Sequence, residues 1–297
     1  MKIGFVVLSH RFPDLQFSRL LDTICRANSE DIHFSIAIHH DFHQSRFPSA
    51  LIDQYNLHFV ENYRPTKWGH VSKVPATLDT FALLQQKENP DWYITLSPNC
   101  YPIKPFNELA NFLKNTVYDT FLEFRKIGSL EDKSHKERSL FTKYWFRYPM
   151  ISRKGDFYLR SLRTRINKQK TPFNDNFEAY TGSDWMALSN YAVKKMLDAK
   201  LYDHPVIDYL SSINEAPDII VSPIEMVIQS FFGNDKSLNH SRKNLHFIDW
   251  EGSVNWHPNT ITMSHIDQIM TSEAFFARKF VSGHSEDIIE EIERTIL

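Results

Sequence analysis

Hydrophobic and polar positions along the first 100 residues change period several times, from the alternation of a strand to the spacing of a helix. Strands are predicted at residues 2–10, 33–41, 57–62 and 91–99, and helices at residues 14–27 and 73–86. Strands that alternate with helices favour a parallel sheet, so we expect an α/β fold. In such sheets, ligands bind beyond the carboxyl ends of the strands.

The second half of the chain follows a less regular pattern. Residues 120–127 and 246–250 read as short strands, and residues 182–197 as a strand that runs into a helix. Helices are predicted at residues 223–232 and 284–297. Since no linker-like segment divides the chain, we expect one domain over residues 1–297, with an irregular basic insertion around residues 125–170.

The composition is that of a globular protein with a core, with 42% hydrophobic and 24% charged residues. Its two cysteines, Cys25 and Cys100, lack motif spacing, which suits a reducing compartment. The apolar run after Met1 meets polar residues within a few positions, which is typical of a buried strand rather than a signal peptide. No window approaches the roughly 20 apolar residues of a membrane span. We therefore expect a cytoplasmic protein.

Charge is spread unevenly. Residues 125–170 contain 14 Lys or Arg and four acids, a local charge of +10, which leaves −12 for the rest of a chain whose net charge is −2. A surface that meets anionic lipid or a polyphosphate ligand would explain this stretch, and so would a solvated basic face. The acidic remainder would repel a long polyanion, so we expect no nucleic-acid partner.

The stretch SPIEMVIQS places one acid, Glu225, just inside an apolar run. Ser222 is a preferred N-cap, Pro223 suits the first helical position, and Glu225 then falls at the third, as in a capping box. Helical spacing continues at Ile224, Val227, Ile228, Phe231 and Phe232. On these residues alone, a structural cap is favoured over a catalytic role.

Other polar candidates follow predicted strands: Ser9 and His10 after the first, and Asp41 after the second. The nearby His39, His40 and His43 have no matched second ligand pair, so zinc is not expected. Cys100 has no histidine partner at a recognisable spacing and is predicted to be a packed thiol. The chain contains no Asp-x-Asp motif.

Seven segments, in order and over nearly the whole length, resemble the core-2/I-branching β-1,6-N-acetylglucosaminyltransferase family. They are FVVLSH with IHHD, KWGHVSKVPATLDTF, DWYITLSPNCYPIKPFNEL, GSDWMALSNYAVKKML, SPIEMVIQS, HFIDW with HPNTIT, and SEAFFARKF. The resemblance implies a GT-A-like glycosyltransferase fold with a mostly parallel sheet, a UDP-sugar donor and inversion at the anomeric carbon.

The resemblance also implies that Glu225 is the catalytic base. A single displacement needs one base for the proton of the attacking hydroxyl, whereas a glycosidase needs two carboxylates. The related family works without a metal, and the match implies that Lys279, with Arg278 beside it, holds the diphosphate. From local sequence alone, these two cations would instead interact with the dipole of a helix end. Asn259 stands where relatives are basic.

For the donor nucleoside, the resemblance suggests Asp41, with Ser9 and His10 as further strand-end candidates; the local alternative for Asp41 is a turn. For the acceptor, it suggests Glu123 and Trp250, followed by Asp184 and Trp185. A buried core position is the alternative for both tryptophans. Relatives carry an aspartate in place of Cys100, and an amide is common in place of Asp184.

These observations predict an inverting, metal-independent glycosyltransferase with no cofactor, which moves N-acetylglucosamine from a UDP-sugar to a glycan hydroxyl. Eukaryotic relatives carry an amino-terminal membrane anchor and a disulfide-rich domain, neither of which is expected here. We therefore expect a bacterial enzyme of surface polysaccharide or lipooligosaccharide synthesis. The basic stretch 125–170 would rest on the inner face of the cell membrane or on a lipid-linked acceptor. Alternatives are a donor such as UDP-xylose, or a non-catalytic glycan-binding protein.

Overall fold

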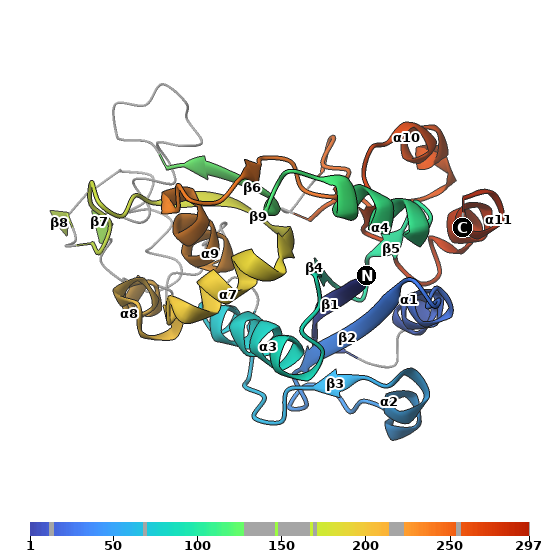
Figure 1. The fold of residues 1–297 in the computed structure, drawn as a ribbon, viewed down its shortest axis with the longest axis horizontal. Helices are drawn as coiled ribbons and strands as arrows, with labels where there is room; N and C mark the ends of the chain where they lie inside the picture. Colours follow the sequence, from blue (N-terminus) through green and yellow to red (C-terminus); the bar gives the residue numbers. More distant parts are fainter. Residues whose placement is uncertain are drawn as a thin grey trace, which may run out of the picture.

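A central sheet of seven strands organises the fold (Figure 1). The computed structural model describes residues 1–11, 15–67, 70–127, 146–147, 167–168, 171–213, 223–253 and 257–296. In spatial order the strands are β10 (His240–Ser241), β6 (Thr120–Lys126), β9 (Tyr180–Ser189), β4 (Trp92–Leu96), β1 (Lys2–Ser9), β2 (His33–His40) and β3 (His58–Phe59). All pairings are parallel except the two that β9 makes. The predicted α/β fold with a mostly parallel sheet is confirmed.

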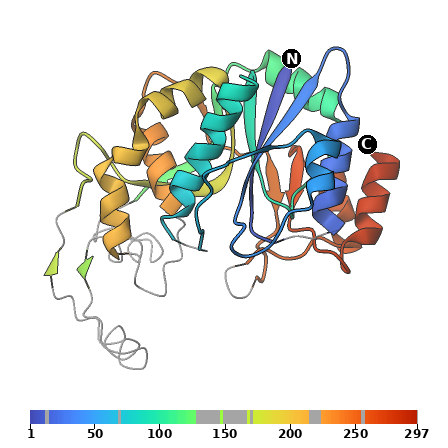
Figure 2. The same ribbon diagram turned by 90° about the horizontal axis from the view of Figure 1, so that it is seen from below.

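Helices cover both faces of this sheet (Figure 2). One face carries α3 (Lys73–Lys87), α7 (Asn190–Asp198), α8 (Pro205–Ile213) and α9 (Pro223–Asn234). The other carries α1 (Leu15–Arg26), α4 (Phe106–Asn115), α10 (Ile266–Thr271) and α11 (Glu286–Thr295). The short helix α2 (Ser49–Tyr55) precedes β3. The sheet is therefore the middle layer of three, which explains why its strands are apolar on both sides.

Two apolar clusters form the core, one on each face. Along β1, Ile3, Phe5 and Val7 enter the cluster under α1 and α4, whereas Val6 enters the cluster under α3 and α9. This alternation follows from the two-residue period of a strand. The side chains of Ile3 and Phe5 are fully buried, and each buried side chain of this size contributes roughly 1.5–3 kcal/mol through burial.

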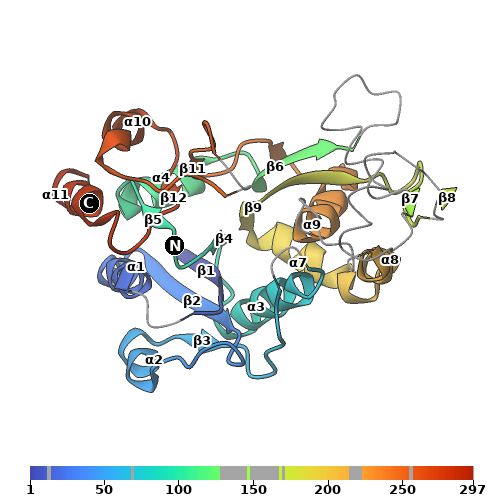
Figure 3. The ribbon, with the colours of Figure 1, turned by 180° about the vertical axis from the view of Figure 1, so that it is seen from behind.

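A smaller sheet lies on the same side as α4, α10 and α11 (Figure 3). It consists of β11 (His246–Ile248), β12 (Phe276–Arg278) and β5 (Tyr101–Pro102). The local interpretation of Arg278 and Lys279 as helix-end cations is wrong, because Arg278 ends a strand and Lys279 follows it. Main-chain pairing with Ile248 of β11 holds Arg278 at the carboxyl end of β12, the middle strand of this sheet.

The predicted strands and helices are found at their predicted positions, whereas α2, α4, α8 and α10 were not predicted. Most of the basic stretch 125–170 lies outside the described residues, apart from the end of β6 and the paired β7 (Phe146–Arg147) and β8 (Asn167–Lys168). Its expected contact with a membrane therefore stays a prediction. Within the described ranges, none of the helices has the length and apolar character needed to cross a bilayer.

Candidate functional site

Most of the predicted site residues gather at one edge of the main sheet. Strands β1, β2 and β4 are parallel, so Ser9, Asp41 and Ser97 lie at or just beyond their carboxyl ends at the same edge. Because β9 is antiparallel to β4, its first half reaches this edge as well. Thr95 secures the junction, since its hydroxyl donates to the main-chain oxygens of Asp184 and Met186 at 3.1 and 3.3 Å.

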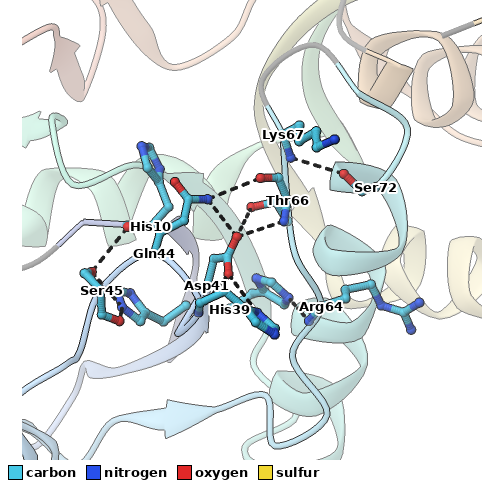
Figure 4. A network of polar contacts seen from close by, with 11 residues as sticks. His10, His39, Asp41, Gln44, Ser45, Arg64, Thr66, Lys67 and Ser72 are labelled. Atoms are coloured by element: carbon cyan, nitrogen blue, oxygen red, sulfur yellow. Dashed lines mark hydrogen bonds and ion pairs between the residues drawn. The ribbon is translucent and has the colours of Figure 1, made fainter. Parts of the chain in front are cut away.

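Asp41 is the centre of a hydrogen-bond network at this edge (Figure 4). Its carboxylate accepts from the main-chain N–H groups of His43 and Thr66 at 3.1 and 2.9 Å, and from Gln44 Nε2 at 2.7 Å. The side chain is only 1% exposed. Burial alone would raise the pKa of Asp41, but the donors from Thr66, Gln44 and His43 outweigh it and lower the pKa.

The hydrogen bonds of Asp41 indicate a structural role for this residue. Both carboxylate oxygens are bonded to the protein, one to His43 and the other to Gln44 and Thr66. The strand-end turn that local sequence offered as an alternative is therefore present, and it anchors the segment that leads into α3. The predicted nucleoside contact of Asp41 stays a prediction, and such a contact would have to share a carboxylate that already has several donors.

We expect Asp41→Asn to lower the free energy of unfolding by about 2–3 kcal/mol at neutral pH, because the amide presents donors where buried N–H groups need an acceptor. The folded-state pKa of Asp41 is lowered, so its contribution is complete above the ordinary value of 3.8 and is lost as the pH falls below it. Denaturant unfolding at pH 7 and pH 3 measures both effects. The loss caused by the substitution should shrink at the lower pH.

Asp53→Asn is the matched control for this experiment. Asp53 is an exposed acid on α2, and surface substitutions of this kind are usually within about 0.5 kcal/mol of neutral. Equal stability of the Asp41 and Asp53 variants would contradict the structural role of Asp41.

The other strand-end candidates are tied into the same region. Ser9 is buried, and its hydroxyl contacts Nδ1 of His40 at 3.2 Å. Nε2 of His39 accepts from the main-chain N–H of Arg64 at 3.1 Å. Burial lowers the pKa of His39 and of His40, so both rings are neutral at neutral pH. His10 is exposed at the end of the first strand, and its side chain is the freest of these groups to meet a ligand.

A wide bulge in β9 shapes the next part of the edge. In the ladder with β6, Leu122 pairs with Met186 and Phe124 with Gly182, so Ser183–Trp185 all lie opposite Glu123. A Cβ atom on Gly182 would lie 1.7 Å from the main-chain oxygen of Glu123, so only glycine fits there. Bulges of this kind re-aim side chains and are common beside active sites. The main chains of three of the predicted acceptor residues, Glu123, Asp184 and Trp185, therefore lie side by side.

Two cationic side chains contact the bulge, one at Asp184 and one at Trp185. Nζ of Lys73, at the start of α3, lies 3.0 Å from Oδ2 of Asp184. The guanidinium of Arg278 lies over the ring of Trp185, 4.3 Å from its centroid. Glu123 is exposed, yet neighbouring protein desolvates it enough to raise its pKa. The bulge thus combines acids, an aromatic ring and two cations.

Buried groups hold Arg278 in place. Burial lowers the pKa of Arg278, and the sulfur of Cys100 and the carboxylate of Asp184 partly offset this. Burial likewise raises the pKa of Cys100 despite the nearby guanidinium, so the prediction of a packed thiol is confirmed. His246 stacks on Phe276 and contacts Trp185; burial and the charge of Arg278 lower its pKa to about 3, so it is neutral.

Lys279 follows Arg278 at the same edge. Its main-chain oxygen accepts from Ile261 N–H at 2.9 Å, and its half-buried side chain makes no ion pair with the residues that the structure describes. Trp250 is 50% exposed, so the buried-core alternative is wrong for it. Asn259 donates to Oδ2 of Asp249 at 2.7 Å, which closes the loop that carries Trp250. Asn259 therefore supports this loop, and no phosphate contact needs to be assigned to it.

Glu225 lies in the first turn of α9, where the capping pattern placed it. The structure describes its main chain only. One helical turn later, the fully buried Gln229 donates from Nε2 to the main-chain oxygen of Ser183 in the bulge. The main-chain N–H of Tyr180 donates to the hydroxyl of Ser230 at 2.9 Å. Helix α9 therefore runs antiparallel to β9, and its first turn is at the end closer to the bulge. Residue 225 is thereby directed to the same edge as Asp184.

Sequence patterns missed Lys73 and Gln229. Lys73 begins a helix that was predicted, but nothing in its own segment indicates a partner 111 residues away. Gln229 did carry a signal, because it is a polar residue inside an apolar helical run and lies four positions after Glu225.

The chain is similar in sequence to known proteins. The sequence profile described as "Branch: Core-2/I-Branching enzyme" matches residues 3–275. Two Arabidopsis thaliana proteins are similar to the chain. Beta-glucuronosyltransferase GlcAT14A is 24% identical over 248 residues, 82% of this chain and 51% of its own length. Beta-glucuronosyltransferase GlcAT14B is 26% identical over 227 residues, 72% of this chain and 46% of its own. The chain thus spans about half the length of these relatives.

Solved structures of low sequence identity also align with the chain. Galactosyltransferase LgtC, in complex with donor and acceptor sugar analogues, has a TM-score of 0.46 and 11% identity, covering 99% of this chain and 93% of that one. Mouse xyloside xylosyltransferase 1 has a TM-score of 0.40 and 10% identity, covering 93% and 97%. Both are glycosyltransferases by name.

Proposed function

Since the chain belongs to the Core-2/I-Branching enzyme family, we propose that it is an inverting glycosyltransferase that moves a sugar from a UDP-sugar to a hydroxyl of a glycan. The observation that carries the proposal is the meeting of three elements at the strand-end edge. Helix α9 is bonded to the bulge of β9 through Gln229, one turn after Glu225, and Arg278 at the end of β12 lies over Trp185 of the same bulge. They would supply a base, contacts for a sugar, and cations for a diphosphate.

In the proposed reaction, the acceptor hydroxyl attacks the anomeric carbon from the face opposite the leaving diphosphate. Glu225 takes the hydroxyl proton as the new C–O bond forms, and the bond to the diphosphate oxygen breaks with its electron pair. One carboxylate suffices for a single displacement. The positive end of the helix dipole favours the ionised form of an acid in the first turn of α9, which is the form that a base requires.

The leaving diphosphate gains negative charge as the bond breaks. Fixed cations stabilise such charge without moving, most strongly where water is partly excluded. We assign this role to Lys279 together with Arg278, whose guanidinium is positioned by Trp185 and Cys100. The chain has no Asp-x-Asp motif, which supports a metal-independent reaction.

Two donors are candidates. UDP-N-acetylglucosamine is expected from the family resemblance, whereas both curated relatives are named β-glucuronosyltransferases, which favours UDP-glucuronic acid. UDP-xylose and a non-catalytic glycan-binding role are further alternatives. A bacterial surface glycan as acceptor stays part of the proposal.

A panel of UDP-sugars tests the proposal directly. We expect one of the three donors to raise the thermal unfolding temperature and to be turned over, because a ligand that binds only the folded state stabilises it. UDP alone should protect as well. CDP- and GDP-sugars serve as controls for the nucleotide. Absence of both protection and turnover with all three UDP-sugars would contradict the proposal, and protection by a glycan alone would favour the binding protein.

A further inference from the structure

Two buried oxygen atoms near the bulge have no hydrogen-bond donor among the described residues: Oδ1 of Asp184 and Oε1 of Gln229. Gln229 is fully buried, and the side chain of Asp184 as a whole is 24% exposed. A buried acceptor without a donor costs roughly 1–3 kcal/mol, so folded proteins seldom keep one without a reason. Two in the same place call for an explanation.

The orientation of both groups is fixed by their other contacts. Gln229 Nε2 must be the atom that faces Ser183, because a main-chain oxygen only accepts, so Oε1 is the free end of the amide. Lys73 pairs with Oδ2 of Asp184 at 3.0 Å, which leaves Oδ1 as the oxygen without a donor among the described residues. Both acceptors therefore point to a partner that donates hydrogen bonds.

The two oxygens also lie in the same seam of the fold. Lys73 reaches Asp184 from α3, and Gln229 reaches the preceding residue, Ser183, from α9. Helices α3 and α9 pack against each other on one face of the sheet. The seam is thus bounded by α3, α9 and the bulge of β9.

We infer that Asp184 and Gln229 form the subsite that binds hydroxyl groups of the transferred sugar ring. This inference rests on the proposed function, in which the ring lies between the leaving diphosphate and the base. It assigns Asp184 to the transferred sugar instead of the acceptor contact that the family resemblance suggests. Asp184 connects these two ends. On the diphosphate side, Asp184 interacts electrostatically with Arg278. On the side of the base, Ser183, the neighbour of Asp184, is hydrogen-bonded to Gln229, which lies one helical turn after Glu225.

Chemistry selects the sugar rather than the nucleotide phosphates as the partner. Ring hydroxyls donate hydrogen bonds, whereas an ionised diphosphate offers only acceptors and would be repelled by Asp184. A carboxylate oxygen accepts a strong, charge-assisted hydrogen bond from a hydroxyl, and Lys73 pairs with the other oxygen of Asp184. A uronic acid donor would have to turn its carboxylate away from this subsite.

Isothermal titration with UDP, UDP-N-acetylglucosamine and UDP-glucuronic acid tests the inference. The quantity compared is the ratio of the Kd for UDP to the Kd for whichever UDP-sugar the wild-type protein binds more tightly. We expect Asp184→Ala to weaken UDP-sugar binding about tenfold and UDP binding by less than about twofold. Asp184→Asn, which keeps the size of the side chain, should shift the ratio in the same direction and covers a folding failure of the alanine variant.

Lys73→Met separates this role from a purely structural ion pair, because it removes the pair but keeps both oxygens of Asp184. We expect it to preserve most of the ratio. An equal loss in the Lys73 and Asp184 variants, or an Asp184 variant with an unchanged ratio, overturns the subsite while leaving the proposed function intact. If the wild-type protein binds no UDP compound, the subsite and the proposed function both fall.

Discussion

Glu225→Gln should reduce kcat by about 100- to 10,000-fold, because the amide cannot accept the proton of the attacking hydroxyl. Stability should change little, since a capping box accepts glutamine as readily as glutamate. The rate is measured with the best donor of the UDP-sugar panel under saturating acceptor, and folding by denaturant unfolding. A loss of activity at unchanged stability would separate the catalytic role from the cap.

Glu286→Gln is the matched control for this variant. Glu286 also lies in the first turn of a helix, α11, where it accepts a hydrogen bond from the main-chain N–H of Gly283. That bond lowers its pKa, as expected for a capping acid. We expect the Glu286 variant to keep wild-type activity.

The dependence of kcat/KM on pH is a second, independent test of Glu225 as the base. A base must be ionised, so wild-type kcat/KM should fall as the pH drops through the pKa of Glu225. The Gln variant should lose this acidic limb and keep a low, flat profile. Two outcomes would remove Glu225 from the mechanism: activity within about threefold of wild type, or an acidic limb that persists in the variant.

The sheet could be predicted from sequence because each buried strand must present apolar side chains at a period of two. Residues 2–9 illustrate this, with Ile3, Phe5 and Val7 on one face and Val6 on the other. Strands of two or three residues, such as β5 and β12, are too short to show a period. For this reason the local sequence around Arg278 and Lys279 indicates the end of a helix, whereas the structure has a short strand there.

Helix α4 was missed although its pattern was readable. Phe106, Leu109, Ala110 and Leu113 are buried at i, i+3, i+4 and i+7, the spacing of an amphipathic helix.

The geometry of the site depends on contacts between distant residues, which a single sequence does not encode in a local pattern. The bulge exists because β6 and β9 pair with unequal numbers of residues, opposite Glu123. The ion pair of Lys73 with Asp184 forms because α3 packs against α9, which itself packs on β9. Sequence reasoning named Asp184 and Trp185 but could not predict that the bulge joins them to the end of β12. The secondary structure around single residues was thus easier to predict than the contacts between them.

Lys279→Met should reduce kcat by about 100- to 1,000-fold, the range found when one fixed donor to developing negative charge is removed. The fold should tolerate the change, because the side chain makes no ion pair within the described residues and the main chain is held by Ile261. Lys243→Met is the control: Lys243 is 83% exposed and pairs loosely with Glu273 at 3.5 Å. Its removal should leave kcat unchanged, since exposed pairs contribute little.

A chelator decides whether these side chains act alone. If Arg278 and Lys279 stabilise the leaving diphosphate, wild-type turnover should be the same in EDTA and in added manganese or magnesium. The loss of turnover in Lys279→Met should then be the same under all three conditions, because no metal ion contributes to the charge that the substitution removes. Turnover that disappears in EDTA and returns with manganese would assign the leaving group to a metal, and Lys279 would then have to act elsewhere.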